Sequence, residues 1–243
     1  MRKSFSVRDL CYIAIMTAVI AVCAFIVIPL PGGVPFTLQT WAILLAGMIL
    51  GPKKGVVAVL IYILLGLVGV PIFHGGRSGL EVLAGPTGGF LISFPLLAFA
   101  AGLRRAHTER RGQMPSAAAN APENREGDAG NRGIRRGFRR YLNGLLENVR
   151  SHSPEAASER NKKARSKRTQ NIILAAAMIA ATIVNWTFGM TWFVVVMSST
   201  FATAFAATVA PFILPDLFKI IAAIIVGRRI QAALSFSGNK IKQ

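Results

Sequence analysis

The sequence predicts an all-α integral membrane protein, a bundle of six transmembrane helices with the N and C termini in the cytoplasm. Two observations predict this class. Of the 243 residues, 53% are hydrophobic, yet the chain carries a formal net charge of +18. A soluble domain does not combine these values. Because the apolar residues form long runs flanked by basic clusters, we expect a polytopic membrane protein.

The first three apolar segments are separated by breaks rich in proline and glycine. They predict spans at residues 10–28, 38–50 and 55–70. Basic residues precede the first segment, as in a signal peptide, but its apolar run is too long for one, and we expect it to be retained. Cys11 and Cys23 would lie roughly 18 Å apart on that helix, so no disulfide is expected between them.

Three further spans complete the predicted bundle. The fourth is expected at 87–103 with a kink at Pro95, and the fifth at 170–197. The sixth begins near Phe212 and ends before Arg228, and the linker before it is expected to form at most a short helix. Residues 1–103 thus hold helices one to four and residues 170–230 hold helices five and six. A cytoplasmic tail is expected at 231–243.

Residues 104–169 differ in composition from the rest of the chain. Together with Leu103 they contain 17 Lys/Arg and 7 Asp/Glu, which gives a net charge of +10. Because large apolar residues are few, we expect a basic, mostly disordered insert. Residues 134–149 form a candidate amphipathic helix for an anionic membrane surface. Nucleic acid is not expected as a partner, because no stacking pattern or binding motif accompanies the charge.

The charge distribution predicts the orientation of the bundle. With six spans, the N-terminus, the loop at 51–54, the insert and the C-terminus all lie on the cytoplasmic side, and all are basic. The loops at 29–40, 71–86 and 198–215 then lie outside and carry almost no charge. Five or seven spans would break this agreement.

The last apolar segment carries an acid and a base near its start, Asp216 and Lys219. Pro215 suits the first position of a helix, which places Asp216 in the first turn and Lys219 on the same face. An ionised group in hydrocarbon costs about 2.5–3.5 kcal/mol on insertion scales, so such groups rarely face lipid. One interpretation is that Lys219 snorkels to the interface or pairs with Asp216. The other is that both line a polar ligand pocket.

Five blocks of residues resemble, in order and spacing, the BioY family, the biotin-specific substrate-binding (S) components of energy-coupling-factor (ECF) transporters. The resemblance covers roughly residues 8–103 and 170–230. The blocks are 34–40 (VPFTLQT), 50–55 (LGPKKG), 71–76 (PIFHGG), 85–90 (GPTGGF) and 211–219 (PFILPDLFK).

The resemblance implies a six-helix bundle in the bacterial cytoplasmic membrane that binds biotin at its outer face and contacts membrane lipids. It also implies docking onto a transmembrane scaffold subunit and two ATPase subunits. Ala14 and Ala18 match the family's small-residue contact with that scaffold. Asp216 and Lys219 match the acidic and basic positions of the ligand site.

Biotin offers a neutral ureido ring, an apolar thioether ring, an apolar tail and a carboxylate. Asp216 can accept hydrogen bonds from the ureido N–H groups, and either Lys219 or Arg77 can neutralise the carboxylate. His74 is expected to be an ordinary loop residue. Further candidates are the polar or backbone groups of Thr87, Gly88, Gly89 and Gln39 and the aromatic rings of Phe36, Trp41, Phe73 and Phe90. Aromatic residues at span ends also serve as interfacial anchors, and Gln39 also fits a solvated loop.

The sequence departs from the family pattern in two places. Leu214 and Pro215 precede the aspartate where the family usually has Pro-Gly, and the insert at 104–169 has no family counterpart. The insert bears on partner interaction more than on biotin binding, because it lies on the cytoplasmic side.

Other function classes are weighed against this one. An S component for a different vitamin would share the bundle, and a membrane anchor or adaptor would act through the basic insert. An enzyme is not expected, because no metal-binding or base–nucleophile set is present. No cofactor is expected, and without a nucleotide motif ATP would act only through partner subunits.

Overall fold

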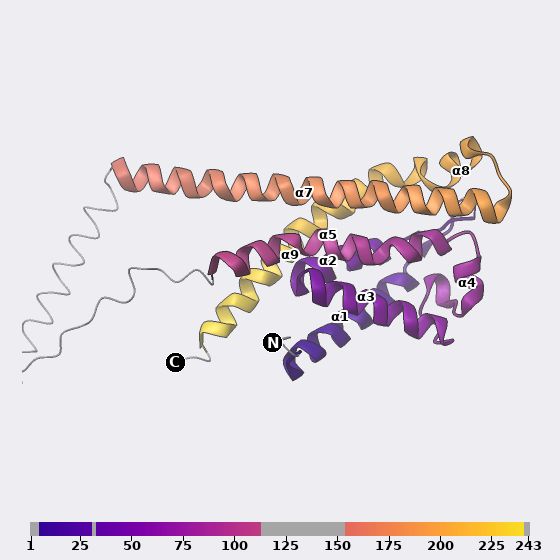
Figure 1. The fold of residues 1–243 in the computed structure, drawn as a ribbon, viewed down its shortest axis with the longest axis horizontal. Coiled ribbons are helices and arrows are strands. Elements are labelled where there is room, and N and C mark those ends of the chain that lie inside the picture. The colour runs from indigo at the N-terminus through magenta and orange to yellow at the C-terminus, as the bar shows by residue number, and fades with distance from the viewer. Residues whose placement is uncertain (1–4, 31–32, 113–153, 241–243) are drawn as a thin grey trace, which may run out of the picture. The chain divides into compact units, whose positions relative to one another are not determined.

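The computed structural model describes residues 5–30, 33–112 and 154–240, and nearly all of them are helical (Figure 1). A small antiparallel hairpin joins the first two helices, with Val27 opposite Thr37 and Ile28 opposite Phe36. The longer helices are α1 (Val7–Phe25), α2 (Gln39–Leu50), α3 (Pro52–Leu67), α5 (Gly88–Gly112), α7 (Pro154–Met197) and α9 (Ile213–Lys240). The shorter elements are β1 (Val27–Ile28), β2 (Phe36–Thr37), the 3₁₀ turns η1 (His74–Gly76) and η2 (Ala210–Phe212), and helices α4 (Leu80–Ala84) and α8 (Phe201–Thr208).

The helices carry the apolar character expected of a membrane protein. Among the described residues, three helical stretches are long and apolar enough to cross a bilayer: Val7–Phe25, Thr169–Met197 and Phe201–Gln231. Two shorter helices, Gln39–Leu50 and Gly88–Leu103, are also apolar. The prediction of a mostly helical membrane protein is therefore confirmed.

The chain divides into two compact units, one made of 1–111 with 173–243 and the other of 112–172. In the second unit, the described residues are Gly112 at the end of α5 and the first portion of α7, from Pro154 onward. The prediction of a mostly disordered insert is wrong for 104–112, which continue α5, and for 154–169, which begin α7. These stretches are rich in Ala, Glu, Lys and Arg, which favour helices as well as solvation. The candidate amphipathic helix at 134–149 lies outside the described residues.

Three other boundaries differ from the sequence-based expectation. The first helix ends at Phe25 because Val27 and Ile28 pair with the strand at Phe36–Thr37. The loop after α3 contains η1 and the short helix α4. The last helix continues to Lys240, so most of the expected tail is helical.

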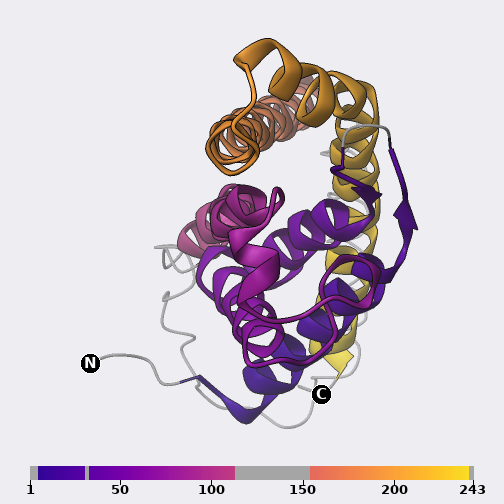
Figure 2. The same ribbon diagram turned by 90° about the vertical axis from the view of Figure 1, so that its right-hand side faces the viewer.

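Helix α2 lies at the centre of the first unit. It runs among the other helices of that unit (Figure 2). It contacts α1, α3 and α9, and all its residues from Ala42 to Leu50 are buried. Gly47 permits this packing, because a Cβ there would collide with the backbone carbonyl of Ala98 in α5. A helix that is apolar on all sides belongs inside a bundle, so α2 forms the core against which the others pack.

The connecting elements gather at one end of the first unit. Helices α4 and α8 lie at that end, whereas α1 begins and α9 ends at the other (Figures 1 and 2). The segments that the sequence analysis expected to be outward loops therefore share one end of the bundle.

A buried threonine joins α1 to α3. The hydroxyl group of Thr17 lies 2.9 Å from the carbonyl oxygen of Ile13 in its own helix and 3.1 Å from that of Ala58 in α3. One hydroxyl proton thus serves both acceptors, and only the second contact crosses between helices.

We predict that Thr17→Val lowers the stability of the purified protein by about 1 kcal/mol, in the range measured for interhelical hydrogen bonds in membranes. Valine keeps the shape of the side chain and removes the donor. Thermal unfolding in detergent measures the effect. Thr187→Val is the matched control, because the exposed Thr187 hydroxyl donates only to Ile183 of its own helix. Equal melting temperatures for both variants would contradict the interhelical role.

Candidate functional site

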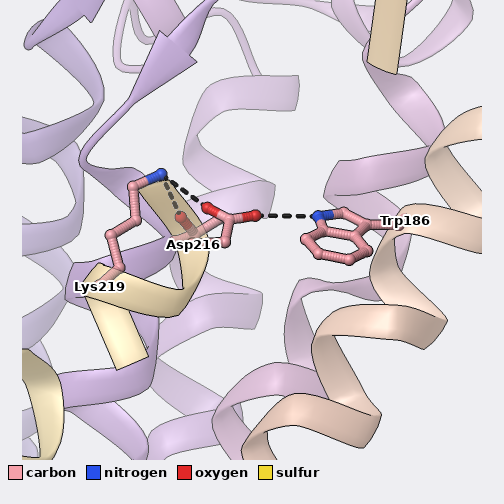
Figure 3. A network of polar contacts seen from close by, with 4 residues as sticks. Trp186, Asp216 and Lys219 are labelled. Carbon is pink, nitrogen blue, oxygen red and sulfur yellow. Dashed lines mark hydrogen bonds and ion pairs between the residues drawn. The ribbon is translucent and has the colours of Figure 1, made fainter. Parts of the chain in front are cut away.

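A buried ion pair lies in the first turns of α9. The carboxylate oxygen Oδ1 of Asp216 lies 3.0 Å from Nζ of Lys219, and the two residues are only 6% and 4% exposed (Figure 3). The helix begins at Ile213, so Pro215 is its third residue and not its first, as predicted. Asp216 is still within the first turn, where the helix dipole favours an anion.

Further partners complete the hydrogen bonding of this pair. Lys219 Nζ also donates to Thr40 Oγ1 at 3.0 Å and lies 4.0 Å from the ring centroid of Phe36. Asp216 Oδ2 accepts a hydrogen bond of 2.9 Å from the indole N–H of Trp186 in α7 (Figure 3). The Lys219 ammonium group has three N–H donors, and it makes three contacts, with Asp216, Thr40 and the ring of Phe36. Removing one member of a buried pair typically costs about 3–5 kcal/mol.

The ion pair borders an open pocket whose empty space, adjoining solvent included, is about 510 Å³. The hairpin, η1, η2 and helices α2, α5, α7 and α9 all contribute to its lining. Of the fifteen lining residues, seven are apolar or aromatic and eight carry polar or charged side chains. They are Val34, Pro35, Thr37, Gln39, Thr40, His74, Thr87, Phe90, Leu91, Phe94, Asn185, Trp186, Phe212, Asp216 and Lys219.

Five of the predicted ligand-site residues line this pocket: Gln39, Thr87, Phe90, Asp216 and Lys219. A sixth, Phe36, lies beside it, because its ring covers Lys219 and stacks on the Phe212 ring at 6.5 Å between centroids. The fold thus brings together residues that were predicted in three separate segments of the sequence.

Five other predicted residues lie outside the pocket lining. Phe73 is fully buried against Tyr62, Trp41 packs against the apolar core, and Arg77 is exposed. Gly88 and Gly89 allow close packing of α5, because a Cβ on either would collide with α4 or with Phe188 and Trp192 of α7. Phe73 and Trp41, which were expected to wall the site, therefore pack in the apolar core of the described structure.

Several pocket residues were not predicted. Trp186 and Asn185 lie next to each other within the apolar span of α7, and polar groups inside such a span are the signal that points to a site. Asn185 Oδ1 accepts a hydrogen bond of 2.6 Å from Ser93 in α5. His74 was expected to be an ordinary loop residue, yet it lines the pocket.

A hydrogen-bond chain orients Gln39. Its amide nitrogen donates to the hydroxyl oxygen of Tyr62 at 2.9 Å, and that hydroxyl donates to the carbonyl oxygen of Ile72 at 3.0 Å. Because the nitrogen faces Tyr62, the amide oxygen of Gln39 is left as an acceptor beside the pocket.

Ala14 and Ala18 lie on the exposed side of α1, four residues apart. Leu10 and Val22 extend the same row, and they are 54% and 64% exposed. The row is therefore an apolar, small-residue face that nothing else in the described chain covers.

Comparison with known proteins gives consistent matches. The BioY family model matches residues 1–121 and 145–236. The biotin transporter BioY of Thermotoga maritima is 50% identical over 96 residues, which are 40% of this chain and 56% of that protein. The probable biotin transporter BioY of Pyrococcus horikoshii is 43% identical over 98 residues, 40% of this chain and 60% of that protein. These matches thus span little more than half of the length of either relative.

A longer match and a solved structure extend the similarity to most of the chain. The biotin transporter BioY of Rhizobium etli is 29% identical over 228 residues, which cover 93% of this chain and 94% of that protein. The crystal structure of the S-component for biotin from an ECF-type ABC transporter has the same fold, with a TM-score of 0.62 at 22% identity. That similarity covers 94% of this chain and 95% of the other. The resemblance found in the sequence is confirmed, and the chain belongs to the BioY family.

Proposed function

We propose that this protein binds biotin in the pocket beside Asp216 and Lys219 and takes it up across the cytoplasmic membrane as the S component of an ECF transporter. The observation that carries the proposal is the fully bonded ion pair at the edge of a pocket whose lining surface is largely apolar. Membership of the BioY family and the biotin transporters among its relatives support it. The same membership agrees with the prediction that the chain is not an enzyme.

The chemistry of the pocket suits biotin. The ureido ring is uncharged and presents two N–H donors, for which the Asp216 carboxylate and the Gln39 amide oxygen are acceptors. A hydrogen bond to a carboxylate contributes about 1.5–3 kcal/mol net. Phe90, Leu91 and Phe94 supply apolar surface for the thioether ring and the tail.

For the membrane arrangement, we propose six crossings, formed by α1, α2, α3, α5, α7 and α9, with both termini in the cytoplasm. The positive-inside bias supports this orientation, since Lys53 and Lys54 lie in the first turn of α3 and Arg228 and Arg229 lie in the second half of α9. The pocket then opens at the outer end, where the hairpin and η1 lie.

Coupling to energy requires partner subunits in this proposal. The sequence contains no nucleotide-binding motif, so a transmembrane scaffold and two ATPase subunits would supply the ATP-driven step. The exposed face of Ala14 and Ala18 on α1 supports docking of the scaffold there, because small residues let a second helix approach closely.

We predict that Asp216→Asn weakens biotin binding by at least about tenfold, the equivalent of one charge-assisted hydrogen bond. The substitution removes the negative charge and leaves the buried ammonium of Lys219 without its counter-ion. Isothermal titration of the full chain in detergent measures the change. Glu81→Gln is the control, because Glu81 is an exposed acid outside the pocket.

Unchanged affinity in Asp216→Asn would remove Asp216 from the site. Thiamin and riboflavin serve as comparison ligands in the same titration. Binding of either one in place of biotin would favour an S component for a different vitamin.

We also predict that Ala14→Leu with Ala18→Leu abolishes uptake without changing biotin affinity. The added side chains would hold a partner helix away from α1, whereas the pocket is lined by other residues. Radiolabelled biotin uptake with co-expressed scaffold and ATPase subunits measures the first effect, and titration measures the second. Ala176→Leu with Ala180→Leu is the matched control, since these residues form an equally spaced exposed pair on α7. Normal uptake by the α1 variant would contradict docking at this face.

A further inference from the structure

In the proposed function the ion pair binds the ureido ring, and it has no free N–H donor or net positive charge with which to bind an anion as well. Both oxygens of Asp216 accept hydrogen bonds, and Lys219 Nζ is directed at Asp216, Thr40 and the ring of Phe36. The two charges cancel, so the pair as a whole does not attract a carboxylate. A ligand that carries both a neutral ring and a carboxylate therefore needs a second polar contact elsewhere in the pocket.

Among the polar side chains that line the pocket, most already have a protein partner. Gln39 donates to Tyr62, Asn185 accepts from Ser93, and Thr40 and Trp186 bond to the ion pair. Within the part of the chain that the structure describes, the lining side chains with no hydrogen bond to protein are those of Thr37, His74 and Thr87. His74 is the one of the three that can become positively charged.

The turn that carries His74 is well anchored. Phe73 is fully buried, and its backbone N–H donates to the carbonyl oxygen of Arg77 at 2.9 Å. The N–H of Gly76 donates to the carbonyl oxygen of Phe73 at 3.0 Å. Gly75 has a φ of 67°, a left-handed conformation that glycine adopts without strain. These contacts therefore hold the backbone of His74 in a defined conformation beside the pocket.

The surroundings of His74 favour its neutral form in the absence of a ligand. Burial lowers the pKa of the imidazole, and the positive charge of Arg77 lowers it further. The other charged groups that share the pocket with His74 are Asp216 and Lys219, which compensate each other. A ligand carboxylate beside His74 would offset both effects and favour the protonated ring.

We propose that His74 binds the carboxylate of the ligand and determines the preference of the pocket for the acid over its neutral esters. The positive charge of Arg77 attracts the carboxylate at long range. Arg77 does not contact the ligand, because it is exposed and lies outside the pocket lining. The proposal rests on the proposed biotin function and assigns the end of the ligand that the ion pair does not hold.

The test compares biotin with biotin methyl ester, which lacks the negative charge. Calorimetric titration of the full chain in detergent is run at pH 8 and pH 6 for wild type, His74→Ala, His74→Asn, Arg77→Gln and the loop control Ser78→Ala. Ser78 lies outside the pocket. Biotin remains ionised at both pH values, because carboxyl groups titrate near pH 4. Binding of the ester shows whether each variant retains a folded pocket.

We expect both His74 variants to weaken biotin binding by about tenfold and to change ester binding by less than about twofold. In wild type and Ser78→Ala, biotin should bind several-fold more tightly at pH 6 than at pH 8, because the complex takes up a proton at His74. Ester binding should not depend on pH, and neither should biotin binding by the His74 variants.

Three outcomes would overturn the inference. If the His74 variants weaken acid and ester equally, or weaken neither, His74 does not distinguish the carboxylate. If Arg77→Gln removes the preference for the acid while His74→Ala keeps it, the anion binds to Arg77. If the wild-type protein binds neither biotin nor its ester, the proposed function fails together with the role of His74. The first two outcomes instead overturn only the role of His74, because biotin still binds.

Discussion

The structure depends on providing hydrogen-bond partners for one acid and one base inside an apolar helix bundle. Each ionised group would cost about 2.5–3.5 kcal/mol in hydrocarbon, so Asp216 and Lys219 require partners on the neighbouring helices. Trp186 of α7 and Thr40 of α2 provide them, and the Phe36 ring covers the ammonium. The contacts that neutralise the pair thus bring α2, α7, α9 and the hairpin to one point, and the pocket lies beside it.

Close helix packing supports this arrangement. Gly47 lets α2 approach α5, and Gly189 in α7 accommodates the ring of Phe90, which lines the pocket. A side chain at Gly189 would collide with that ring and displace it. The apolar wall and the polar edge of the pocket therefore rely on the same helix contacts. In the proposed function, a pocket with an apolar wall and a polar edge fits a ligand with a neutral polar ring, an apolar body and a charged end.

Sequence reasoning located the ion pair because two charged residues in an apolar segment are conspicuous. It did not find Trp186 or Thr40 as partners, since they lie 30 and 179 residues away from the groups they bond. The sequence does not show whether an aromatic ring at the end of a span faces the pocket or the core. Phe36 and Phe73 were therefore both predicted to line the site, although only Phe36 contacts Lys219. The basic residues at 154–169 are compatible with both a solvated coil and a helix. Composition favoured the coil, whereas the structure has a helix there.

Tryptophan fluorescence tests most directly whether the ligand sits against the ion pair. Trp186 is the one tryptophan of three that lines the pocket. Emission is recorded for wild type, Trp186→Phe and Trp41→Phe as biotin is added to concentrations that calorimetry shows to be saturating. The account predicts a saturable change in wild type and Trp41→Phe that is absent from Trp186→Phe. The same change in Trp186→Phe would show that biotin binds away from Asp216 and Lys219, and would contradict the account.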